Sequence, residues 1–197
     1  MTASKAWDVS GIALAVLFRC CSAEAASLVV DLRPQTNVPP QTLSAATEVA
    51  AALFRDIGVT IAWTTADSPG EYDPRVPWRR IAVIDQPTPA YSAALTTDRV
   101  LGVSPRAFDE PGRVGVIFYD RVLRTSQQAR IPSGALLGYA IAHEIAHLLL
   151  PAGHAERGVM RASWSRLDLR RIATRVLAFD PPYAALIRTR LVDARNR

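Results

Sequence analysis

Short β-branched runs and one long amphipathic run alternate along the first part of the chain. Residues 27–34 (SLVVDLRP) predict a strand that ends at proline, and residues 59–63 (VTIAW) predict a second strand. Between them, residues 39–58 place apolar side chains at helical spacing and end in glycine. This strand–helix–strand order favours two parallel strands joined by a crossover helix.

Three further runs predict additional strands. Residues 79–85 and 112–120 are rich in valine and isoleucine, and residues 98–105 have the pattern of a short edge strand. Segments rich in proline and glycine separate these runs. We therefore expect a small mixed β-sheet.

Helical periodicity dominates the rest of the chain. Residues 133–150 predict a long, mostly apolar helix, which a proline and a glycine terminate. Residues 163–179 predict an amphipathic helix, and residues 183–192 predict a last helix after a proline pair. The expected fold class is α+β, with a crossover helix on a small mixed sheet, a long helix and a helical C-terminal subdomain.

The first 25 residues have a different pattern. Lys5 precedes an apolar stretch at residues 12–18, and Ala23-Glu24-Ala25 offers a small-residue cleavage site. This order is typical of a secretory signal peptide, and the apolar stretch is too short to span a bilayer. We expect residues 1–25 to be removed from a secreted or periplasmic protein.

The rest of the chain, residues 26–197, has the length of a single domain. We expect residues 26–150 to hold the sheet and the long helix, and residues 151–197 to form the C-terminal helical part. Polar residues interrupt the apolar stretch at 135–150, so we expect no stable membrane anchor.

Charge and cysteine content exclude several kinds of site. The net charge is +5, and Lys5 is the only lysine among the basic residues. The arginines after residue 151 recur without a like-charged run, which favours a solvated basic face over a nucleic-acid surface. Cys20 and Cys21 lie in the predicted signal peptide, so the mature chain would have no disulfide and no cysteine ligand or nucleophile.

All three histidines of the chain lie within "HEIAHLLLPAGH". His143 and His147 are four residues apart on the long helix, so both imidazoles face one side and can share a Zn²⁺ ion. Glu144 is one step round the helix, where a carboxylate can take a proton from water held on that metal. Because the helix is otherwise apolar, these polar side chains favour a metal site over a pair of hydrogen-bonded histidines in the core, which would leave Glu144 without a partner.

A catalytic zinc site needs a third protein ligand. Gly153 permits a sharp reversal after the helix, so His154 is the leading candidate. The carboxylates of Glu156 and Asp168 are alternatives.

The stretch resembles the metzincin clan of zinc metallopeptidases, whose signature is HExxHxxGxxH followed by a methionine-containing turn. His143, Glu144 and His147 match directly, whereas His154 comes one residue later than the signature expects. Met160 stands where a compact metzincin would have its Met-turn.

The resemblance implies a zinc-dependent endopeptidase with Glu144 as general base and then general acid. An extended protein or peptide substrate would pair with an edge strand, supplied by residues 98–105 or 112–120. Two alternatives stay open: a gluzincin-like peptidase with a carboxylate as third ligand, and a non-catalytic zinc-binding or interaction domain. The sequence indicates neither the cleavage specificity nor the oligomeric state.

Overall fold

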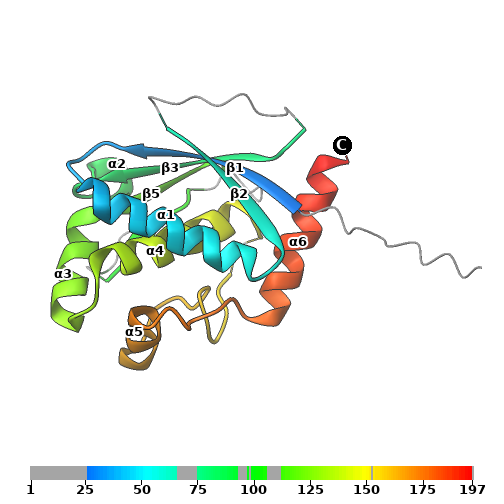
Figure 1. Cartoon of the computed structure of the whole chain (residues 1–197). Helices are drawn as coiled ribbons and strands as arrows, with labels where there is room; N and C mark the ends of the chain where they lie inside the picture. Colours follow the sequence, from blue (N-terminus) through cyan, green and yellow to red (C-terminus); the bar gives the residue numbers. More distant parts are fainter. Residues whose placement is uncertain are drawn as a thin grey trace, which may run out of the picture.

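A five-stranded mixed sheet forms one layer of the protein in the computed structural model (Figure 1). The structure describes residues 26–65, 75–92, 97, 99–105, 112–151 and 153–196, so the predicted signal peptide lies outside the described residues. The strands are β1 (Ala26–Pro34), β2 (Val59–Thr64), β3 (Trp78–Ile84), β4 (Gly102–Val103) and β5 (Val114–Phe118). Their spatial order is β2-β1-β3-β5-β4, and β4 alone of these strands runs antiparallel to its neighbour. The sheet confirms the predicted α+β class.

The predicted strand–helix–strand unit is present. Helix α1 (Pro40–Arg55) connects β1 to β2, which pair in parallel from Ala26 opposite Val59. Pro40 is tolerated at the start of the helix because the first helical N–H has no intrahelical acceptor. Gly58 ends the connection with a φ of 76°, a conformation that favours glycine.

Helices cover one face of the sheet and extend beyond it (Figure 1). After α1 they are α3 (Tyr119–Ala129), α4 (Ser133–Leu149), α5 (Arg166–Ala173) and α6 (Pro181–Arg195), whereas the short α2 (Pro89–Ser92) lies against the other face, where Tyr91 packs with Ala82, Val116 and Phe118. Helix α4 packs on α1 and under the sheet, while α3 and α6 lie at opposite ends of the helical layer in this view. Among the described residues, no helix combines the length and apolar character needed to cross a membrane.

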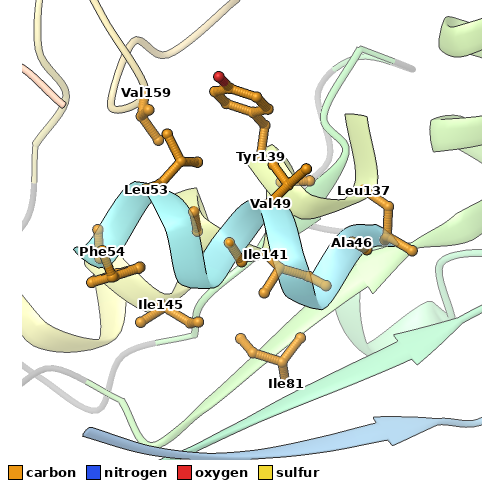
Figure 2. Close-up of a cluster of buried hydrophobic side chains, with 14 of the residues drawn as sticks. Ala46, Val49, Leu53, Phe54, Ile81, Leu137, Tyr139, Ile141, Ile145 and Val159 are labelled. Carbon is orange, nitrogen blue, oxygen red and sulfur yellow. The ribbon is translucent and has the colours of Figure 1, made fainter. Parts of the chain in front are cut away.

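The contact between α1 and α4 is unusually close because α4 carries glycine there. A Cβ atom built at Gly138 would lie 2.7 Å from the Ala46 carbonyl oxygen and 2.7 Å from Val49 Cβ. Side chains of Val49, Leu53, Ile141 and Ile145 fill the adjoining core (Figure 2). Removing apolar surface of this kind from water is the main stabilising term in a domain.

Two helix predictions need correction. No helix was predicted between the strand at 112–120 and the helix at 133–150, but α3 begins directly at Tyr119 and buries Val122 and Ser126 along one face. Its few apolar residues, separated by polar ones, gave only a weak periodic signal. The helix predicted at 163–179 is shorter in the structure. Helix α5 ends at Ala173, and the backbone of Arg175 adopts the left-handed conformation with a φ of 58°.

The chain after α5 is buried in an extended form rather than in a helix. Leu177 and Phe179 are core residues, and the Ala178 carbonyl accepts a hydrogen bond of 3.0 Å from the Val159 amide. Burial explains their apolar character, which suggested a helix in the sequence. The prolines that follow occupy the first turn of α6.

Candidate metal centre

The three histidines lie together at the end of α4. His143 and His147 project one turn apart from the helix. Gly153 has a φ of 133°, which L side chains rarely adopt, and the chain turns there so that His154 meets them. His147 Nε2 lies 3.0 Å from His143 Nε2 and 3.1 Å from His154 Nε2.

This arrangement fits a metal ion. The three ligand atoms lie within 4.8 Å of one another, and imidazole is the commonest nitrogen ligand of zinc. Zinc–nitrogen bonds of about 2.0–2.1 Å in tetrahedral geometry place ligand nitrogens about 3.3 Å apart. The observed separations are close to that value, so the cluster can bind a metal through three Nε2 atoms.

The backbone fixes the orientation of His143. Its Nδ1 donates to the Val159 carbonyl at 2.8 Å, which leaves the Nε2 lone pair directed at the cluster. Burial lowers the pKa of His143 to about 4; the Val159 contact opposes this shift and His154 adds to it. The ring is therefore neutral at pH 7, as a metal ligand must be.

Trp164, which the sequence analysis did not select, contacts the same carbonyl and ring. Its Nε1 donates to the Val159 carbonyl at 3.3 Å, and its ring meets the His143 ring edge-on with centroids 5.9 Å apart. A tryptophan within a polar segment (ASWSR) is the sequence signal for such a role.

Met160 lies in the turn that follows His154. The side chain is fully buried, and the Met160 carbonyl accepts a hydrogen bond of 2.8 Å from the Ala155 amide. Gly158 has a φ of 77° and packs so closely that a Cβ there would lie 2.5 Å from the Ala178 carbonyl oxygen. The turn is therefore tightly held, and the Met-turn role of Met160 stays a prediction.

Glu144 is held between α4 and the edge of the sheet. Its carboxylate Oε2 accepts a hydrogen bond of 2.8 Å from Ser104 Oγ, and the residue is only 5% exposed. The Glu144 side chain fits there because two neighbouring residues are glycines. A Cβ at Gly102 would lie 2.9 Å from Glu144 Cγ, and one at Gly115 would lie 3.4 Å from Glu144 Cβ. Burial raises the pKa of Glu144 to about 7, although the Ser104 hydrogen bond opposes the shift.

The carboxylates considered as alternative ligands are placed elsewhere. Glu156 is exposed and is not part of the cluster of ligand atoms. Asp168 is engaged at the start of α5, where it accepts from the Ser165 amide at 2.9 Å and from Arg161 at 2.8 Å. Among the described residues, the structure brings only the histidines together as a group of three.

A cleft with a volume of about 1430 Å³ opens over the histidines and Glu144. One side consists of β4 and the residues around it, and α3 and α5 contribute the other walls. Because β4 is the last strand of the sheet, the structure places residues 99–105, rather than β5, at the rim.

Comparison with known proteins gives a fold but no family. Neither a protein-family profile nor a curated protein sequence matches this chain. The structure is similar to the crystal structure of archaemetzincin from Methanopyrus kandleri, with a TM-score of 0.56 and 18% sequence identity. The match covers 86% of this chain and 98% of that protein. The chain therefore shares its fold with archaemetzincin, and its histidine cluster can bind a metal.

Proposed function

We propose that this protein is a zinc-dependent endopeptidase that hydrolyses peptide bonds. The observation that carries the proposal is the convergence of three histidine Nε2 atoms beside a buried glutamate in one cleft. His143, His147 and His154 would hold the ion. When bound, zinc lowers the pKa of a coordinated water to about 7 and polarises a carbonyl group.

Glu144 is suited to move the proton. Ser104 donates to Oε2, so Oε1 is the atom at which Glu144 would accept a proton from water before passing it to the leaving amine. A carboxylate positioned beside the ligand cluster can act as general base towards water and then as general acid towards the leaving group. Zinc binding alone would not require this residue.

The edge of the sheet would position the substrate. Among the described residues, β4 pairs with β5 on one side only, through Gly102 opposite Ile117 and Val103 opposite Val116. An extended peptide can add to such an edge by main-chain hydrogen bonds, which are independent of its sequence. The substrate would then pass over the histidines within the same cleft.

The first experiment compares zinc content and peptide hydrolysis in the purified chain, His154→Ala and Glu144→Gln. We expect about one zinc per chain in the parent, a large loss in His154→Ala, and full zinc but at least a hundredfold lower turnover in Glu144→Gln. Bound zinc should also raise the melting temperature, because it binds the folded state.

Each other outcome selects an alternative. Full zinc retention in His154→Ala would support a carboxylate third ligand, as in a gluzincin-like peptidase. One zinc per chain with no hydrolysis of a peptide library would support a non-catalytic zinc-binding domain. A folded parent that takes up no zinc would contradict both metal-dependent functions.

A further inference from the structure

The walls of the cleft are rich in arginine. Six arginines line it: Arg99, Arg121, Arg124, Arg161, Arg166 and Arg170. Glu144 is the only acidic residue among the described lining residues. The whole chain has 23 basic and 18 acidic residues, so its composition does not account for such an excess.

Three of these arginines have structural partners. Arg121 is buried, donates to the Thr97 and Val100 carbonyls at 3.0 and 2.9 Å, and so fixes the segment before β4. Arg124 pairs with Asp120, and Arg161 pairs with Asp168 at 2.8 Å. Their charges are at least partly compensated by the protein.

The other three, Arg99, Arg166 and Arg170, are exposed, and two of them, Arg166 and Arg170, form a pair on α5. They lie one turn apart on α5, both are exposed, and the described part of the chain shows no ion pair for either side chain. Two like charges four residues apart destabilise a helix. Arg166 is also the first residue of α5, where the helix dipole disfavours a positive charge. Helix stability therefore does not explain Arg166.

We infer that the cleft selects acidic peptides, and that Arg166 and Arg170 bind carboxylate side chains next to the scissile bond. This inference rests on the proposed function. The guanidinium group binds a carboxylate with two parallel hydrogen bonds, which gives direction as well as attraction. A bound divalent cation would add to the positive field of the cleft.

The lining favours a peptide over a single-stranded nucleic acid. Binding of nucleic acids in a groove combines positive charge with aromatic platforms for the bases. Tyr91 and Trp164 are the aromatic residues of the described lining. Trp164 already packs edge-on against Tyr139 and His143.

The test uses two fluorescently labelled peptides of equal length, one with glutamates on both sides of a central Ala-Ala and one with glutamines. Binding to the metal-free and zinc-loaded chain is measured by fluorescence anisotropy, so the readout does not depend on turnover. We expect the glutamate peptide to bind about tenfold or more tightly, as for one or two charge-assisted hydrogen bonds.

Two double variants make the result specific. Arg166→Gln with Arg170→Gln should abolish the preference for glutamate. Arg55→Gln with Arg190→Gln removes the same charge at exposed positions outside the cleft lining and should preserve the preference. Equal binding of the two peptides, or an equal loss in both double variants, would overturn the inference.

A further outcome separates the partner classes and the two proposals. A single-stranded oligonucleotide that binds more tightly than the glutamate peptide, and loses binding in Arg166→Gln with Arg170→Gln, would assign the cleft to nucleic acid instead. Cleavage of both peptides at equal rates would refute the acidic preference and leave the peptidase proposal intact. Selective binding of the glutamate peptide without hydrolysis of either peptide would support the acidic preference and refute the peptidase proposal.

Discussion

The two sides of α4 show how one helix can serve as core and as site. On one side, Gly134, Gly138, Ile141 and Ile145 follow helical spacing and pack against α1 and the sheet. On the other, Ala140, His143, Glu144 and His147 follow the same spacing and line the cleft. The first side has no room for a methyl group, whereas the second borders an open volume.

The packed side of α4 therefore contributes to stability, and the cleft side carries the polar groups of the candidate site. The packed side holds the helix against two elements, so the direction of every other side chain on α4 is set by contacts that do not involve the histidines. The cleft side can then carry polar groups whose positions depend on a few hydrogen bonds. Substitutions on the two sides should therefore have different consequences.

The largest expected effect comes from filling the packed side. Gly138→Leu should lower the free energy of unfolding by about 3 kcal/mol or prevent folding, because its Cβ and longer side chain meet the Ala46 carbonyl and Val49. Gly138→Ala should cost less, since about 1 kcal/mol of helix propensity offsets part of the clash. Urea denaturation of the metal-free proteins measures both.

The control for this prediction is His147→Ala, on the cleft side. It should abolish the three-histidine cluster but change the unfolding free energy of the metal-free protein less than Gly138→Ala does. If Gly138→Ala is as stable as the parent, or if His147→Ala is the more destabilised variant, the two sides of α4 do not divide their roles as described.

An intermediate effect is expected on the cleft side, at the contact that holds Glu144. Ser104→Ala removes a hydrogen bond of 2.8 Å to a carboxylate, a kind of bond that contributes about 1.5–3 kcal/mol. We expect turnover to fall about tenfold or more while KM and zinc content stay unchanged, because Ser104 positions the base and does not touch the histidines. Steady-state kinetics on a cleaved peptide measures the two constants separately.

Ser163→Ala is the matched control for this loss, since Ser163 is exposed and lines the same cleft. Its turnover should equal that of the parent. A Ser104→Ala variant with full turnover would show that packing around Gly102 and Gly115 is enough to hold Glu144 in place.

The sequence was most informative where a function depends on local spacing. His143 and His147 are one turn apart on any α-helix, and Gly153 marks a reversal, so both features could be predicted before the fold was known. The parallel β1–β2 pair was predictable for the same reason, because the crossover helix separates two clear strands.

Contacts between distant segments were not predictable from spacing. Ser104 meets Glu144 across 40 positions of the chain; the pattern at 98–105 predicted a short edge strand, but it did not predict the pairing of that strand with β5. Helix α3 was missed because its buried face includes a serine and an arginine, whose burial depends on partners elsewhere. The arginine-rich cleft likewise exists only after α3 and α5 are placed around it.

The smallest expected effect concerns the ionic contacts of the cleft wall and depends on pH. Burial raises the pKa of Asp168, but hydrogen bonds from Ser165 and Arg161 outweigh it, so the folded-state pKa lies below its ordinary value. A lowered folded pKa contributes stability that is complete above the ordinary carboxyl pKa and is lost as pH falls through the folded value.

Asp168→Asn should thus lower the free energy of unfolding by about 1 kcal/mol at pH 7, and the difference from the parent should shrink below about pH 4. Urea denaturation at several pH values measures this difference in unfolding free energy. Both proteins keep the same histidines, so the effect of histidine titration cancels in the comparison. A difference that is constant from pH 7 to pH 3 would contradict the prediction, because it would show that the charge of Asp168 does not stabilise the start of α5.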